Sequence, residues 1–197
     1  MRNYFEIRME LLAPYNTTQN NPHHVGDLLH HIQKMVDNRF VVCDFIQNRY
    51  AFHEAIMVHD IGKKDTKKEK DGKDTFYGHA KAGTEIIKNS RKELGYDQLP
   101  NKDFDYLLEL VLLHDTKYSK MGKINNMINT HQEGFSVDLL CLQVLDILGQ
   151  SDFNKPEKLE EVKSFASKIL KADNITAKET ETINKIINLI NGIANTY

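Results

Sequence analysis

Hydrophobic residues recur at intervals of three and four along almost the whole chain, which is the spacing of amphipathic helices. In the segment 25–38, for example, Leu28, Ile32 and Met35 form one apolar stripe between polar positions. We find no convincing alternating strand followed by a hairpin turn. The pattern therefore predicts an all-α fold, with helices over residues 5–12, 25–38, 40–47, 50–61, 79–94, 103–115, 124–128, 135–150, 156–171 and 178–193.

Loops are predicted where polar or charged residues replace the apolar stripe, at residues 14–22 and 63–74. We expect Gly62 to end the helix 50–61 in the left-handed conformation, which satisfies terminal carbonyl groups. Thr176 is placed to cap the last helix. Because the sequence shows neither an internal repeat nor a long linker, we expect residues 1–197 to form a single domain, an orthogonal helical bundle.

Charge and cysteine content narrow the class of protein. The chain has 197 residues with 26 Lys and Arg against 28 Asp and Glu, a net charge of −2, so no general basic field indicates nucleic-acid binding. Its most apolar window, 137–148, is interrupted by polar residues and is far too short to span a membrane. Cys43 and Cys141, which we expect as buried thiols in helices, indicate a reducing compartment. The charged start of the chain does not resemble a signal peptide, so we expect a cytoplasmic protein.

Helix geometry separates the histidines that face the core from those that face solvent, and it also marks one aspartate as unusual. Asp146 lies in a helix that is apolar almost all round, where an unpaired carboxylate would cost several kcal/mol. His30 is predicted to face outward with polar neighbours. The inward-facing histidines, each continuing or ending an apolar stripe, are His31, His59, His79 and His114.

A single inward histidine is more often a hydrogen-bonded core residue than a ligand, and a lone buried aspartate is more often a cap or half of an ion pair. When several inward histidines and carboxylates lie on different helices, a single bound dication explains all of them, because its charge offsets the cost of their desolvation. The adjacent His59 and Asp60 can contact one ion only near a helix end, which Gly62 supplies. Nitrogen and oxygen ligands without thiolate favour Mn, Fe, Co, Ni or Zn over Ca or a closed structural zinc site.

The order of these residues resembles a known signature. His31, then His59 and Asp60 in Val-His-Asp-Ile-Gly-Lys, then Asp146, resembles the HD superfamily of metal-dependent phosphohydrolases, over residues 22–152. The resemblance implies an HD-type metal-binding core there, with the helices of residues 153–197 completing the bundle. The stretches 76–83 and 111–115 are similar to HD domains of tRNA nucleotidyltransferases and poly(A)-polymerase-like proteins.

The chain also departs from those relatives. Residues before Pro22 are too few for a nucleotidyltransferase domain, so we expect a free-standing HD domain without transferase activity.

The resemblance also implies ligands. It assigns His31, His59, Asp60 and Asp146 to a first metal, and Asp60 is able to bridge to a second ion. His79 and His114 match two histidines that hold the second metal in binuclear members and face the substrate in others. One or two divalent ions per site are therefore expected.

Three further residues receive roles from their positions. Lys63 follows the doublet by one turn and is a candidate for contacting a substrate phosphate, against the alternative of a solvated surface lysine. Asp115 is a candidate acid for the leaving group, a partner of a ligand, or a simple helix-end charge. Tyr77 is interpreted as a packing residue.

These observations predict hydrolysis of a small phosphorylated substrate, a nucleotide or a related phosphomonoester or phosphodiester, including 2′,3′-cyclic and dinucleotide forms. Asp60, Lys63 and Asp115 are the expected catalytic residues, and Lys63, His79 and His114 are expected to contact the substrate. A non-catalytic nucleotide-binding module and a di-iron oxygenase of the HD type remain alternatives. The oligomeric state is left open.

Overall fold

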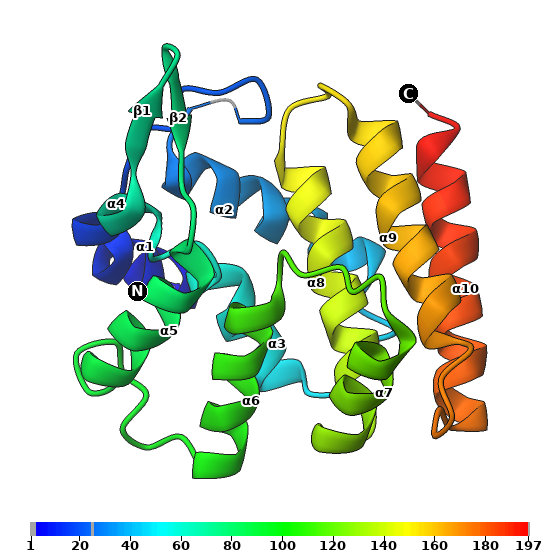
Figure 1. Cartoon of the computed structure of the whole chain (residues 1–197). Helices are drawn as coiled ribbons and strands as arrows, with labels where there is room; N and C mark the ends of the chain where they lie inside the picture. The colour runs from blue at the N-terminus through cyan, green and yellow to red at the C-terminus, as the bar shows by residue number, and fades with distance from the viewer. Residues whose placement is uncertain (1–2, 25, 197) are drawn as a thin grey trace.

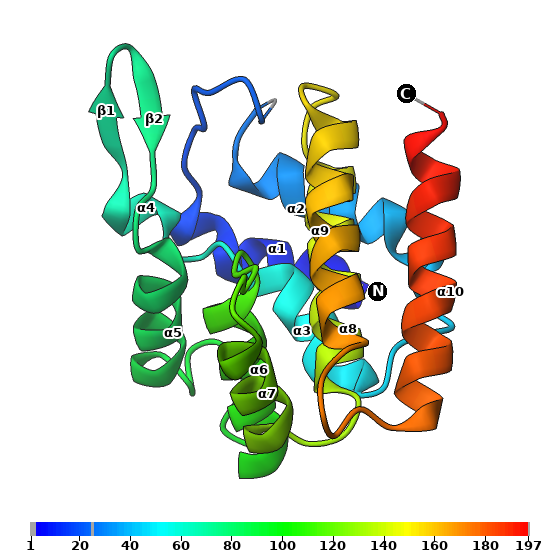
Figure 2. The same cartoon turned by 45° about the vertical axis from the view of Figure 1, so that its right-hand side comes forward.

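Helix α8 (Phe135–Gly149) is buried along almost its whole length, as its sequence requires. A helix that is apolar all round must be covered on every side. The computed structural model describes residues 3–24 and 26–196, and it places α8 among helices from both halves of the chain (Figures 1 and 2). The helices that contact α8 are α2 (Leu28–Asn38), α3 (Arg49–Val58), α6 (Asn101–Leu113), α9 (Lys155–Ile169) and α10 (Ala177–Ala194).

The remaining helices extend this core. Helix α5 (His79–Asn89) packs on α6, and α7 (Met121–Thr130) packs on α9. The chain begins with α1 (Tyr4–Leu12) and includes the short elements η1 (Ala13–Tyr15), η2 (Arg39–Val41) and α4 (Lys63–Thr66). This arrangement confirms the predicted all-α, single-domain fold.

Helix α1 is fixed to the core by a buried ion pair. Arg8 lies 2.7 Å from the Glu54 carboxylate of α3 and donates a hydrogen bond of 2.6 Å to the carbonyl oxygen of Leu94. Burial raises the pKa of Glu54 to about 7, although a hydrogen bond from the Tyr96 hydroxyl opposes this shift. The N-terminal helix thereby supports α3, which ends at the candidate site.

The expected charged loop 63–74 is instead α4 followed by a β-hairpin, so the prediction of no hairpin was wrong. Strands β1 (Lys68–Lys70) and β2 (Lys73–Thr75) pair antiparallel, with Lys68 opposite Thr75. Their turn uses Asp71 and Gly72 at φ 52° and 72°, the residue pair typical of a tight hairpin turn. Because the strands are highly charged, a search for apolar alternation missed them. The hairpin projects from the helices in Figures 1 and 2.

The predicted helix 40–47 was also wrong. Only the short η2 forms there, followed by turns. The buried Asp138 carboxylate accepts the backbone N–H groups of Gln47 and Asn48 at 2.7 and 2.8 Å, which holds this stretch away from helical hydrogen bonding. As a result Cys43 is exposed in a turn rather than buried in a helix, whereas Cys141 is buried as expected.

Several helix boundaries differ from the pattern. Helix α2 begins at Leu28, because Gly26 has φ 88° and the Asp27 side chain caps the helix; Val25 lies outside the described residues. Helix α5 ends at residue 89 rather than 94, and α7 spans 121–130 rather than 124–128. The predicted cap of the last helix is confirmed, since Thr176 and Glu179 form a capping box.

Gly62 does not adopt the left-handed conformation that the sequence suggested. Its φ is −79°. The reason for glycine is space, because a Cβ there would lie 2.2 Å from the carbonyl oxygen of His79 and 2.4 Å from the amide nitrogen of Gly83. The absent side chain lets the turn after α3 contact the backbone of α5.

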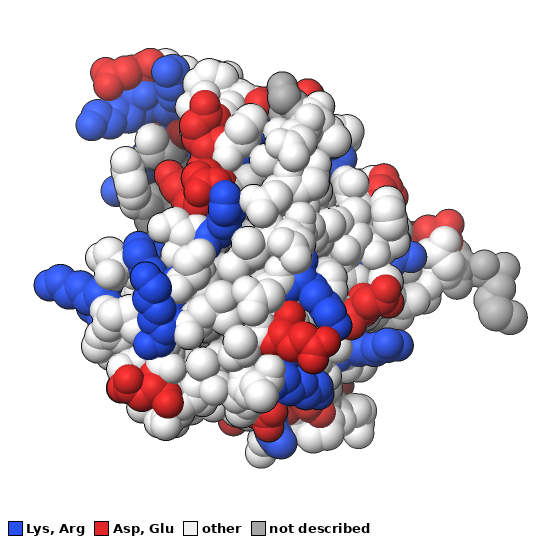
Figure 3. All heavy atoms as spheres, turned by 90° about the vertical axis from the view of Figure 1, so that its right-hand side faces the viewer, with Lys and Arg blue, Asp and Glu red and all other residues white. Residues whose placement is uncertain are grey.

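A membrane-spanning helix must be long and apolar, and one face of the molecule shows how its charges are distributed. Within residues 3–24 and 26–196, no helix has the length and hydrophobicity needed to cross a membrane. On the face shown in Figure 3, acidic and basic side chains are intermixed.

Gly62→Ala is expected to destabilise the metal-free protein by about 1–3 kcal/mol, because its methyl group would collide with backbone atoms that cannot rotate away. Urea denaturation measures this change. Gly192→Ala is the matched control, since nothing lies within 4 Å of a Cβ at that helical position. The control should gain up to about 1 kcal/mol from helix propensity. Equal stability of the two variants would contradict the close-approach explanation.

Candidate metal centre

His59 and Asp60 lie where α3 ends and the backbone turns. His59 is the C-cap of α3, and its amide still donates to Ala55 at 2.9 Å. Residues 59–62 then form turns, closed by a hydrogen bond of 3.0 Å from the Lys63 amide to the Asp60 carbonyl. This opening of the helix lets both neighbouring side chains point to one region.

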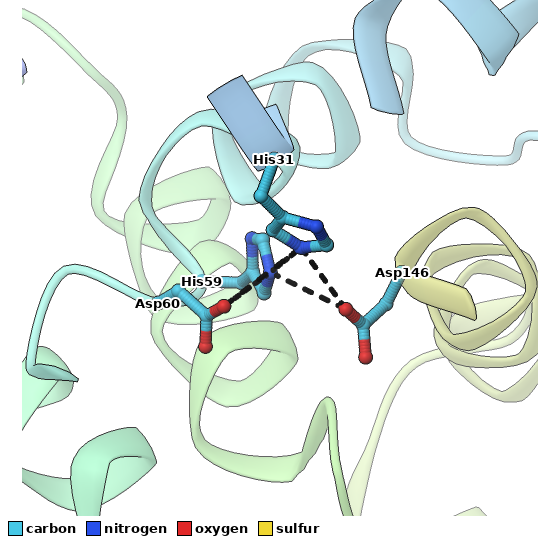
Figure 4. A group of neighbouring side chains, drawn as sticks. All are labelled: His31, His59, Asp60 and Asp146. Atoms are coloured by element: carbon cyan, nitrogen blue, oxygen red, sulfur yellow. Dashed lines mark hydrogen bonds and ion pairs between the residues drawn. The ribbon is translucent and has the colours of Figure 1, made fainter. Parts of the chain in front are cut away.

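The structure brings His31 of α2 and Asp146 of α8 to the same region (Figure 4). The Nε2 atom of His31 is 3.3 Å from that of His59 and 3.1 Å from Oδ1 of Asp146. The Nε2 atom of His59 is 3.2 Å from Oδ2 of Asp60. One ligand atom from each of the four residues lies within 4.8 Å of all the others.

Close packing of α2 against α8 supports this group. A Cβ at Gly149 would lie 2.8 Å from Cε1 of the His31 ring. Glycine at this position therefore leaves space for the imidazole between the two helices.

A second group shares the Asp60 carboxylate. Its Oδ1 atom is 3.1 Å from Nε2 of His79 and 3.5 Å from Nε2 of His114, and these two nitrogens are 3.1 Å apart. His79 begins α5, directly after Gly78 at φ 82°, and His114 is the C-cap of α6. Each of the six predicted ligands thus belongs to one of two adjacent groups joined by Asp60.

Hydrogen bonds fix the orientation of three imidazoles. In His59, His79 and His114, Nδ1 faces the carbonyl oxygen of the residue three positions earlier. These distances are 3.1, 2.9 and 2.7 Å, to Ile56, Phe76 and Val111. Because a carbonyl oxygen only accepts, Nδ1 carries the proton, and in the neutral ring the Nε2 lone pair points into the site.

Lone pairs that face one another at such distances require a cation or a proton between them. His79 and His114 direct two such nitrogens to one carboxylate oxygen, at 3.1 and 3.5 Å. A proton can serve only one donor and acceptor pair, whereas a metal ion accepts several donors at once. The donor set therefore fits a divalent metal bound by imidazole nitrogen and carboxylate oxygen.

Both aspartates carry the charge that ligation requires. Burial raises the pKa of the Asp60 carboxyl, but the electrostatic effects of the adjacent His59 ring and the Lys63 ammonium group outweigh it and hold the pKa well below its ordinary value. At Asp146 burial acts in the same direction, and hydrogen bonding and charge from His31 overcome it, so that this pKa is also held well below its ordinary value. The Asp146 side chain keeps 19% exposure and so borders the open cleft.

Lys63 is not the solvated surface lysine that was one alternative. It is 5% exposed, and its Nζ lies 2.6 Å from Oδ2 of Asp60 and 2.7 Å from Oε1 of Gln19. The same ammonium group lies 5.4 Å from the centre of the Phe76 ring. Lys63 therefore reaches the site through a fixed set of contacts.

In the N-terminal loop, sequence reasoning missed Gln19 and assigned no role to His24. Gln19 is 4% exposed and binds Lys63. Burial, followed by the charge of Lys63, lowers the pKa of His24 to about 3, so its ring is neutral beside that lysine. No periodic pattern marks Gln19, because it lies in a polar loop, 44 residues from its partner.

A cleft of about 550 Å³ opens onto the two ligand groups. Asp115 is exposed at this cleft and has no hydrogen-bond or ion-pair partner among the described residues, so its role as an acid stays a prediction. Tyr77 also lines the cleft and is 86% exposed, so its interpretation as a packing residue was wrong. A larger cavity of about 820 Å³, between α1, α2 and α3, contains none of the six predicted ligands.

The comparison with protein families decides the assignment, since the family model for the HD domain matches residues 24–177. The chain belongs to the HD-domain family. The match reaches past residue 152 and includes α9 of this HD domain. No curated protein and no solved structure gave a significant match. The finer similarity to HD domains of tRNA nucleotidyltransferases stays a prediction.

His31→Ala should weaken Mn²⁺ binding by at least about tenfold, because it removes an imidazole from the first group. Isothermal titration of metal-free protein measures this affinity. His30→Ala is the matched control, since His30 is the exposed neighbour on α2. The control should bind Mn²⁺ as the unmodified protein does. If both variants retain full affinity, His31 is not a ligand.

Proposed function

We propose that this HD domain is a metal-dependent hydrolase that cleaves phosphate esters of small molecules, nucleotides among them. The observation that carries the proposal is the Asp60 carboxylate shared by two ligand groups, with the buried Lys63 against it. With divalent ions held by both groups beside Lys63, the site would carry a net positive charge, and anionic phosphate is the substrate group that such a site would attract. The cleft is large enough for a small molecule.

The proposed ligands fall into the two groups already described. His31, His59, Asp60 and Asp146 would hold one ion, and Asp60 with His79 and His114 would hold a second. When bound, a divalent metal such as Mn, Fe, Co, Ni or Zn polarises a phosphoryl oxygen and lowers the pKa of coordinated water toward neutrality.

Lys63 supplies a further positive charge from the chain itself. Its ammonium group forms an ion pair with Oδ2 of Asp60 at 2.6 Å and donates a hydrogen bond to Oε1 of Gln19 at 2.7 Å. Its third neighbour is Nε2 of His24, at the longer distance of 3.4 Å. A phosphate oxygen is a stronger acceptor for an N–H group of Lys63 than an imidazole at that distance. We therefore assign Lys63 the role of stabilising the negative charge that develops on the phosphoryl group.

Dialysis against a chelator should abolish hydrolysis of p-nitrophenyl phosphate and bis(p-nitrophenyl) phosphate, and addition of Mn²⁺ or Ni²⁺ should restore it. Release of p-nitrophenol measures the rate. His31→Ala should remain inactive after metal addition, whereas His30→Ala should recover.

Undiminished turnover by metal-free protein would contradict the proposal. Nucleotide binding without turnover across a broad substrate panel would assign a binding module instead. Oxygen uptake by iron-loaded protein, without phosphate release, would assign an oxygenase.

A further inference from the structure

Tyr77 presents an aromatic ring to water at the rim of the candidate site. At 86% exposure it is the most exposed large hydrophobic side chain among the described residues. It lines the same cleft as Asp60, His79 and His114. Covering an exposed aromatic ring with another apolar surface is favourable, because it removes both surfaces from water. The Tyr77 ring is therefore available to contact a ligand.

The backbone that carries Tyr77 is firmly held. The carbonyl oxygen of the preceding Phe76 accepts hydrogen bonds from both the amide and Nδ1 of His79, at 3.1 and 2.9 Å. Gly78 follows in the left-handed conformation at φ 82°. The ring therefore projects from a fixed support two residues before a proposed metal ligand, rather than from a free loop.

The hairpin that leads to Tyr77 is also attached to the N-terminal loop. The Asp74 amide donates to the Asn20 carbonyl oxygen at 2.9 Å, and the Asp74 carboxylate accepts the Asn20 amide at 2.6 Å and binds Lys67 at 2.9 Å. These contacts occupy the acidic group of Asp74. They leave the exposed Lys73 as a basic group on the same wall of the cleft.

The cleft thus differs in chemistry between its floor and its rim. Its floor holds Asp60, Asp146, His79, His114 and Lys63, which would suit a phosphate once metal is bound. Its rim holds a rigid, exposed aromatic ring and Lys73. A ligand that satisfies both parts carries a phosphate and a flat aromatic ring, separated by a short spacer.

We propose that Tyr77 is a specificity-determining residue that stacks on the base of a nucleoside phosphate, so that the site selects nucleotides over sugar phosphates. The proposal rests on the phosphohydrolase function proposed above for its phosphate end. The stacking itself does not require hydrolysis. Stacking of a base on an aromatic side chain is strong enough to set such a preference and tolerates different bases.

The first experiment measures stacking without turnover. Adenosine, guanosine, cytidine and uridine are titrated into the protein, and binding is followed by ligand-observed NMR. At least one nucleoside should bind, with Tyr77→Ala weakening it by about tenfold and Tyr77→Phe preserving it. Tyr50→Ala is the control, because Tyr50 is 50% exposed but lines the separate cavity beside α1. Failure of every nucleoside to bind, or binding that is indifferent to Tyr77→Ala, would overturn the stacking role.

The second experiment separates this inference from the hydrolase proposal. In metal-loaded protein, Tyr77→Ala should raise KM for AMP by about tenfold while leaving KM for ribose 5-phosphate unchanged. An equal rise for both substrates would overturn the specificity role and leave the hydrolase proposal intact. Nucleoside binding that depends on Tyr77, together with no hydrolysis of any phosphate ester, would support the stacking site and contradict the hydrolase.

Discussion

The site depends on one buried carboxylate that faces two sets of imidazole nitrogens. Oδ1 of Asp60 faces His79 and His114, while Oδ2 faces His59 and Lys63. Backbone carbonyls hold the Nδ1 protons of three histidines, so their lone pairs converge on acceptor oxygen. Such an arrangement is unfavourable in a dry interior unless a cation occupies it. Metal binding is therefore the property from which the other functional assignments follow.

Close packing between helices positions the residues that surround the Asp60 carboxylate. Gly62 allows the turn after α3 to contact α5, which carries His79, and Gly149 leaves space between α8 and the His31 ring. The buried apolar surface of α8 fixes the helix that carries Asp146, whose side chain borders the cleft. The proposed ligands come from distant parts of the chain. They can meet because glycine occurs where the α5 backbone and the His31 ring approach closely.

The sequence predicts much of the fold, and it singles out most residues that cluster at the candidate site because they leave periodic traces. Inward histidines were identifiable because each continues an apolar stripe, and Asp146 because it interrupts one. The hairpin was missed because its strands lack apolar alternation, although Asp71 and Gly72 carried the turn signal. Gln19 could not be found, because its role arises from a single long-range hydrogen bond to Lys63. The exposure of Tyr77 depends on tertiary packing, which the local pattern does not contain.

Anomalous diffraction from crystals grown with Mn²⁺ tests the central claim most directly. The account predicts an anomalous peak at roughly 2.0–2.3 Å from Nε2 of His31 and His59 and from carboxylate oxygens of Asp60 and Asp146. A second peak beside His79 and His114 would identify a binuclear site. Fully occupied crystals with no peak among these residues would contradict the account.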